Sequence, residues 1–245
     1  MDKRILIGVS TVADGNMSVK WGEKTVVEGN RMKFLDKLGI KYEDCVLASL
    51  LGGTEINIVD SGYKKKYIEG DALITKEKGV GLFMVTADCL PVVLYDKTRQ
   101  ILALVHLGWR GVDGKLAIKV IKKLGEFGCK PADIQVWIGP GVKKETYIKY
   151  GKKLEEFRKI MGEDSFREWQ EFLVKTPIKD QFGVDLIGFV WKQLDEMGIK
   201  KEQIDVSNVD TIRDTNYFSH YRAGQTGEKE GRFATVAMIK KMNEK

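Results

Sequence analysis

Hydrophobic positions along the chain follow the period of an α-helix in four stretches. In residues 113–128, the apolar Leu116, Val120 and Leu124 lie four positions apart. This spacing places the three side chains on one face, so the pattern predicts an amphipathic helix. Three further stretches with helical spacing are residues 27–40, 151–162 and 185–198.

The first of these helices is defined by fewer apolar positions. Met32, Leu35 and Leu38 recur at a spacing of three residues and predict the buried face of a helix. Gly39 follows directly and is a typical residue at a helix end. The sequence therefore predicts a helix that ends near residue 39.

Shorter apolar runs bounded by turn residues predict strands. Residues 91–96 and 101–106 flank the tetrapeptide KTRQ, which predicts an antiparallel hairpin with a four-residue connection. Weak alternation around Gly52 and Gly53 predicts a strand, a kink and a second strand in residues 46–59. The remaining strand-like runs are residues 5–10, two runs within 71–89, and residues 134–140, 204–210 and 232–240.

The order of these elements limits the fold classes that the chain can adopt. Strands and helices alternate, and at least one pair of strands forms a hairpin, which favours an α/β or α+β fold with mixed β-sheets. The chain contains no Pro/Gly/Ser-rich linker, internal repeat or low-complexity tract. We therefore expect a single compact domain over residues 1–245, with mixed sheets, hairpins and flanking helices.

Composition narrows the class of protein further. The 245 residues are 43% hydrophobic and 31% charged, which is typical of a globular protein. No apolar run approaches the roughly 18 residues of a membrane span, and the first residues lack the apolar core of a signal peptide. The net charge of +6 comes from scattered Lys with acids among them. We therefore expect a cytoplasmic location and neither nucleic-acid nor membrane partners; the oligomeric state stays open.

Candidate chemistry begins at the predicted hairpin. The chain has three Cys and two His, and both Cys89 and His106 fall in residues 85–111. Cys89 follows a predicted strand, and His106 ends the second strand of the hairpin. A thiolate and an imidazole brought together suit Zn²⁺ or Cu, or a Cys–His nucleophile pair. The plain alternative is a buried Cys beside a hydrogen-bonded His.

A glycine-flanked arginine follows the hairpin. The sequence GWRGVDG (108–114) lies between a strand and a predicted helix, and helix N-termini favour anions. Arg110 offers a bidentate charge for phosphate or carboxylate, and Gly111 allows close approach of the backbone. An ordinary turn with an exposed Arg is the alternative.

A late segment combines aromatic and polar side chains. YFSHYRAGQTG (217–227) contains Tyr217, His220 and Arg222. A nucleoside pocket needs a ring that stacks on the base and polar groups that read the edge of the base. An ordinary turn uses the same residue types, so this segment alone leaves both interpretations open.

Taken in order, these segments resemble one family: the laccase-domain, or multicopper polyphenol oxidoreductase-like, proteins, which are also described as purine nucleoside phosphorylases. The pair TADC-x-P (86–91) and H-x-GWRG (106–111) is the most specific part of the resemblance. The other matching segments are GVST (8–11), GNR (29–31), DALIT (71–75), IGPGV (138–142) with Tyr147, VDL (184–186), YFSHYR (217–222) and RFATV (232–236).

The resemblance implies a compact α/β fold and several activities. These are phosphorolysis of adenosine, inosine and methylthioadenosine, adenosine deamination, polyphenol oxidation, and a cysteine-hydrolase-like role. The family's metal site uses a His from a QVHG-type segment, the Cys of TADC and the His of H-x-GWRG. The last two correspond to Cys89 and His106, but the first segment reads SLLG (49–52), so Leu51 stands where the first His ligand is expected.

The main hypothesis is therefore a purine nucleoside phosphorylase-like enzyme that uses a purine nucleoside and phosphate. Cys89, His106 and Arg110 are its expected catalytic residues. Zinc or copper, held by Cys89 and His106, is expected to bind weakly or not at all because of Leu51. The alternatives are a diverged nucleoside-binding protein, a polyphenol oxidoreductase and a metal-free Cys–His hydrolase. The expected substrate-binding residues are Arg110, Gly111, Tyr217, His220 and Arg222.

Overall fold

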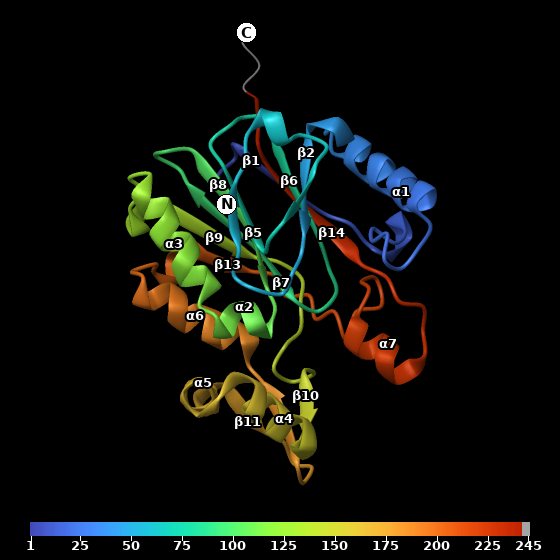
Figure 1. Ribbon diagram of the computed structural model, residues 1–245, viewed down its shortest axis with the longest axis vertical. Helices are drawn as coiled ribbons and strands as arrows, with labels where there is room; N and C mark the ends of the chain where they lie inside the picture. The colour runs from blue at the N-terminus through green and yellow to red at the C-terminus, as the bar shows by residue number, and fades with distance from the viewer. Residues whose placement is uncertain (242–245) are drawn as a thin grey trace.

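Two large β-sheets, each with both parallel and antiparallel neighbours, form the centre of the computed structural model (Figure 1), which describes residues 1–241 and, for residues 150–152, the backbone alone. The five-stranded sheet has the order β1 (Ile5–Val9), β14 (Phe233–Ile239), β6 (Gly81–Thr86), β2 (Cys45–Ser49) and β4 (Tyr67–Glu69). The six-stranded sheet has the order β13 (Ile204–Val206), β9 (Ile134–Ile138), β7 (Leu90–Asp96), β8 (Ile101–Leu107), β5 (Ala72–Thr75) and β3 (Ile56–Ile58).

Strand β7 shows how the layers are held together. Its side chains alternate between the two faces of the sheet, as in any strand. Val93 and Tyr95 pack between the two sheets, whereas Leu90, Val92 and Leu94 pack toward the helices on the other face. Burying an aliphatic side chain of this size stabilises the fold by roughly 1.5–3 kcal/mol. Both faces of the strand are therefore covered, which explains its continuous apolar sequence.

Helices cover the outer face of each sheet (Figure 1). α3 (Leu116–Glu126) and α6 (Leu186–Glu196) pack on the six-stranded sheet, and α1 (Lys24–Lys37) packs on the five-stranded sheet. None of the described helices is long and apolar enough to cross a bilayer. The molecule is thus a four-layer arrangement of helices, sheet, sheet and helices.

The buried face of α1 differs from the predicted one. Leu35 is buried as expected, but Met32 is 43% exposed, and Val27, Arg31 and Phe34 are buried. The Arg31 guanidinium donates hydrogen bonds of 2.6 and 2.8 Å to the Met17 carbonyl. Leu38 is half-buried and packs against the same core as Leu35, so the prediction is wrong for Met32 and misses Arg31, whose burial a hydrophobic pattern does not indicate.

The helix predicted over residues 113–128 is observed from Leu116 to Glu126, and the short helix before it was not predicted. α2 (Trp109–Asp113) is followed by α3, and Lys115 between them has a left-handed backbone with φ of 59°. Leu116, Val120 and Leu124 are buried on one face of α3, as the spacing predicts. The left-handed residue re-aims the chain, so α2 lies at the end of the sheet and α3 runs along it.

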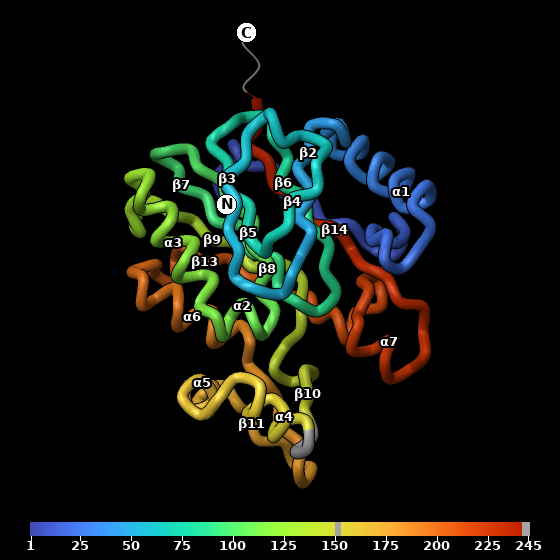
Figure 2. The backbone as a smooth tube through the Cα atoms, viewed as in Figure 1, coloured from blue at the N-terminus to red at the C-terminus, as the bar shows by residue number. Residues whose placement is uncertain are grey.

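Residues 148–184 form a small excursion that lies apart from the two large sheets (Figure 2). It ties back to the rest of the molecule through the buried Trp169, whose Nε1 donates a 2.9 Å hydrogen bond to Asp113. The Trp169 ring also packs edge-on against Phe157 and Phe189. The excursion contains β10 (Ile148–Tyr150), β11 (Leu173–Lys175), β12 (Gln181–Val184), α4 (Gly151–Met161) and α5 (Glu163–Trp169).

The predicted α/β fold with mixed sheets, a hairpin and flanking helices in a compact domain is confirmed. In the hairpin, Asp96 pairs with Ile101 across the predicted four-residue connection. The short strands of the excursion and helix α7 (His220–Thr226) were not predicted. The predicted extent of the domain to residue 245 reaches beyond the described residues and stays a prediction.

Candidate active site

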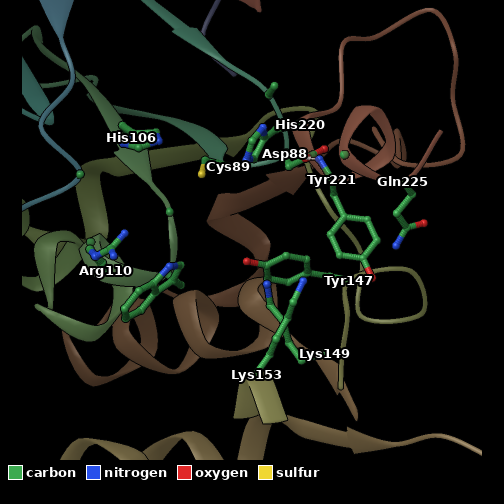
Figure 3. A pocket seen from close by; sticks show the side chains of 16 residues that line it. Asp88, Cys89, His106, Arg110, Tyr147, Lys149, Lys153, His220, Tyr221 and Gln225 are labelled. Carbon is green, nitrogen blue, oxygen red and sulfur yellow. Dashed lines mark hydrogen bonds between the residues drawn. The ribbon is translucent and has the colours of Figure 1, made fainter. Parts of the chain in front are cut away.

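A cavity of about 480 Å³ lies at the end of the two sheets where the chain crosses from one sheet to the other, between β6 and β7. It is bordered by the β6–β7 connection, the end of β8, α2, β10 and α7 (Figure 3). The residues of the sequence prediction that line it are Cys89, His106, Arg110, Gly111 and His220.

Asp88 holds the connection that presents Cys89. β6 ends in one sheet and β7 begins in the other, and Asp88 between them has a left-handed backbone with φ of 80°. Such a backbone is unfavourable for a residue with a side chain. The buried carboxylate compensates, because it accepts hydrogen bonds from Thr211 Oγ1 at 2.8 Å and the Tyr221 amide at 2.7 Å. The turn is fixed, and both carboxylate oxygens are engaged.

Strand register brings Asp71 to His106. Ala72 of β5 pairs with Val105 of β8, so Asp71 meets His106, and their Oδ1 and Nδ1 atoms are 2.8 Å apart. Asp71 is fully buried and also accepts hydrogen bonds from the Gly52 and Gly53 amides at 3.0 and 2.8 Å. Burial by itself raises the pKa of the Asp71 carboxyl, but these hydrogen bonds hold it below its ordinary value. Asp71 is therefore a carboxylate that orients the imidazole.

His106 shares a narrow space with the sulfur of Cys89. A Cβ atom on Gly108 would lie 2.9 Å from Cys89 Sγ and 3.5 Å from His106 Cε1, so the two side chains converge where Gly108 leaves room. Burial lowers the pKa of His106, but its interactions with Cys89 and Asp71 outweigh burial and raise it to about 9. With this pKa the imidazole is charged near neutral pH; its Nδ1 meets Asp71, and its hydrogen bond with Cys89 lies on the other side of the ring.

The residues present do not fit the family's metal site. Leu51, at the position expected for the first His ligand, is an apolar side chain that is 60% exposed. Cys89 and His106 provide two donors, whereas Zn²⁺ takes three or four protein ligands. The carboxylates of Asp71 and Asp88 are occupied by hydrogen bonds. Among the described residues, no group of three or more His, Cys, Asp and Glu side chains is placed to hold a metal ion.

Three cations line the same cavity. Arg110 lies over the Trp109 ring, with its Cζ 4.3 Å from the ring centroid. Lys149 lies over the Tyr147 ring, with its Nζ 4.2 Å from the centroid, and Lys153 lies nearby. Within the part of the chain that the structure describes, none of these three cations forms a salt bridge with a carboxylate. They outnumber the one carboxylate of the lining, Asp88, so the cavity carries an excess of positive charge.

The residues predicted from the late segment divide into two groups. His220 lines the cavity rim, with a largely exposed side chain and its Nδ1 2.6 Å from Glu230 Oε1. Tyr217 and Arg222 do not line the cavity. The Arg222 guanidinium donates to the carbonyls of Thr211 and Tyr217, so it holds its own loop together. This geometry does not support the predicted substrate contacts of Tyr217 and Arg222.

Sequence reasoning also missed residues that line or support the cavity. Asp71 begins the DALIT segment and Tyr147 follows the IGPGV segment, so both stood within the resemblance without an assigned role. Lys149 and Lys153 lay at the boundary of a predicted helix, where nothing marked them. Tyr221, whose hydroxyl donates to the Ile148 carbonyl at 2.7 Å, joins α7 to β10 across the cavity.

The fold defines the class of protein first. The structure of YlmD from Geobacillus stearothermophilus matches with a TM-score of 0.85 and 24% sequence identity, covering 98% of this chain and 93% of that one. The hypothetical protein YfiH from Bacillus licheniformis matches with a TM-score of 0.82 and 23% identity, covering 97% of this chain and 93% of that one. All three chains share this layered α/β fold.

The sequence then places the chain within a family. The model of the multi-copper polyphenol oxidoreductase laccase family matches residues 5–240, so the chain belongs to that family. A purine nucleoside phosphorylase from Corynebacterium glutamicum is 28% identical over 207 residues, which are 84% of this chain and 80% of that protein. An adenosine deaminase from an unknown prokaryotic organism is 25% identical over 203 residues, which are 79% of this chain and 76% of that protein.

Proposed function

We propose that the protein is a purine nucleoside phosphorylase-like enzyme, which cleaves adenosine, inosine or methylthioadenosine with phosphate. The observation that carries this proposal is the cavity itself, where a carboxylate-oriented His106 lies opposite an excess of positive charge. Relatives named purine nucleoside phosphorylase support the same reaction. The proposal assigns a substrate pair of one neutral nucleoside and one anion.

The reaction requires stabilisation of charge at the ribose and at the departing purine. The bond between C1′ of the ribose and N9 of the purine breaks, and a phosphate oxygen bonds to C1′. Positive charge develops on the ribose, so a phosphate anion fixed beside it lowers the barrier. In this proposal Arg110 and the Gly111 backbone help to hold that anion, since a guanidinium matches phosphate geometry.

The departing purine needs a proton. His106 is suited to donate it, because the raised pKa of about 9 keeps the imidazole charged at neutral pH. Asp71 fixes the ring through Nδ1, so in this proposal the proton is donated from Nε2, on the side of the ring where Cys89 lies. Cys89 helps to keep the imidazole charged, because its interaction raises the pKa of His106. No step in this scheme requires a metal ion.

The test is a nucleoside assay with and without phosphate. Purified protein treated with a chelator should release the purine base and form ribose 1-phosphate only when phosphate is present. His106→Asn should lower kcat by about 10²–10⁴-fold, the usual contribution of a general acid. Binding of nucleoside without base release at high enzyme concentration would refute the proposal and favour the nucleoside-binding protein.

A second candidate rests on the order Asp71, His106, Cys89. A carboxylate that orients a His beside a thiol is the arrangement of a Cys–His nucleophile. A metal-free hydrolase or deaminase would convert its substrate without phosphate, and the relative named adenosine deaminase favours adenosine as the compound to try. Phosphate-independent formation of inosine that is lost in Cys89→Ser would support this candidate over phosphorolysis.

A further inference from the structure

The wall of the cavity formed by β10 and α4 carries two cations. Lys149 lies in β10 and Lys153 in the first turn of α4, and both side chains line the cavity. Figure 3 shows them extending alongside each other next to Tyr147, whereas Arg110 projects from α2 at a separate place. The positive charge of Lys153 also lowers the pKa of Lys149. The cavity thus has two groups of cationic side chains, Arg110 on α2 and the two lysines on β10 and α4.

Lys149 is held in an environment that costs free energy when nothing is bound. Burial, followed by the charge of Lys153, lowers its pKa from 10.5 to about 8. Its nearest ring contacts are Tyr147, at 4.2 Å, and Tyr221, at 5.9 Å from Nζ to the centroid. The Asp88 carboxylate acts on Lys149 through space, but both its oxygens already accept hydrogen bonds.

Some other lysines of the chain are paired with a carboxylate. Lys64 lies 2.6 Å from a carboxylate oxygen of Asp44, and Lys192 lies 2.8 Å from one of Glu171. The half-buried Lys149 and the exposed Lys153 have no such partner and face one cavity, so an anion bound there would balance both charges. A phosphate dianion balances the charge of two ammonium groups and has enough oxygens to contact both.

We propose that Lys149 and Lys153 form a phosphate-binding subsite in this cavity. The phosphate group has two sources, free orthophosphate or the 5′-phosphate of a purine nucleotide. The orthophosphate source rests on the proposed phosphorolysis and adds Lys149 and Lys153 to Arg110 as residues that hold the anion. A cavity of about 480 Å³ lies within the usual size range of small-molecule sites.

The experiment measures binding of orthophosphate and, separately, of AMP and adenosine to the full chain by calorimetry, without turnover conditions. Lys149→Met and Lys153→Met should each weaken binding of the phosphate-bearing ligand about tenfold, the size expected for one charge-assisted hydrogen bond. Lys149→Arg should retain most of the affinity. Lys159→Met is the matched control. Lys159 lies on α4 outside the cavity lining, and this substitution removes the same charge as the other two.

The outcomes separate the two sources and the two proposals. Loss of orthophosphate affinity in the Met variants supports the subsite with the co-substrate as ligand, and loss of AMP affinity alone supports it with the 5′-phosphate. Unchanged affinities for orthophosphate and AMP in folded Met variants, or an equal loss in Lys159→Met, would overturn the subsite even if nucleoside is phosphorolysed. Conversely, the protein could bind phosphate in a way that depends on Lys149 and yet never release base. That result would support the subsite and refute the proposed phosphorylase activity. Thermal melting of each variant verifies that it is folded.

Discussion

Leu51 decides whether the cavity can hold a metal ion. The side chain is 60% exposed and its neighbour Gly52 lines the cavity, so a larger polar residue fits there with little cost in stability. Leu51→His supplies a third donor beside Cys89 and His106, which Zn²⁺ requires. We expect zinc near one ion per chain in this variant and well below that in the unchanged protein, measured by elemental analysis.

The control for that prediction adds a His elsewhere. Val26→His places an imidazole on an exposed position of α1, so it should bring no extra zinc. Zinc near one ion per chain in the unchanged protein, removed by Cys89→Ala, would contradict the prediction. Such a result would mean that another donor replaces the missing His.

Asp71 acts through His106 and not on the substrate. Cys89 and Asp71 both raise the pKa of His106, and Asp71→Asn removes the second of these contributions, so the imidazole should lose its proton at a lower pH. We expect the basic limb of the kcat/KM profile to move to lower pH, with kcat reduced more than KM is raised. The chain has only His106 and His220, so the imidazole titration can be followed directly by NMR. An unchanged pH profile would assign Asp71 a purely structural role.

At the scale of elements, the β6–β7 connection joins the two sheets through Asp88. Asp88→Ala removes the acceptors of one buried and one partly buried hydrogen bond and leaves a residue with an alkyl side chain at φ of 80°. We expect a loss of roughly 2–4 kcal/mol in the free energy of unfolding, measured by urea denaturation. Asp88→Asn keeps tolerance for the left-handed backbone and should lose less. Equal losses in both variants would show that the charge matters and the backbone does not.

At the scale of the whole molecule, stability should depend on pH in a way that His106 dominates. The folded pKa of about 9 lies above the ordinary 6.5, so the stabilisation is complete below pH 6.5 and disappears as pH rises through 9. A shift of this size corresponds to at most roughly 3 kcal/mol. We expect the free energy of unfolding to fall between pH 6.5 and 9, and to fall less in His106→Asn.

Lys149 contributes with the opposite sign and must be separated. Its folded pKa of about 8 lies below the ordinary value of 10.5, so its penalty is full below pH 8 and is relieved as pH rises toward 10.5. Repeating the pH series in Lys149→Met removes this contribution and leaves the part due to His106. A flat stability curve between pH 6.5 and 9 in that variant would contradict the assignment to His106.

The sequence alone determined the elements that have a clear period. The hairpin of β7 and β8 and the helix α3 follow directly from apolar spacing, because burial of one face imposes that spacing on any sequence. Cys89, His106 and Arg110 were found because their segment is distinctive, and the structure places all three on one cavity. The strands of the excursion have three or four residues each, which is too short to show a period, so they were missed.

Only the tertiary structure decided what each element packs against. Consecutive strands β2 and β3, and likewise β5 and β6, belong to different sheets, although their sequences predict only strands. Asp71 reaches His106 across 35 residues through strand register, and Lys149 reaches the cavity because the excursion folds back on Trp169. A periodic pattern records that a face is buried and not what buries it, because the hydrophobic effect is non-directional and the partner is selected by packing of the whole chain.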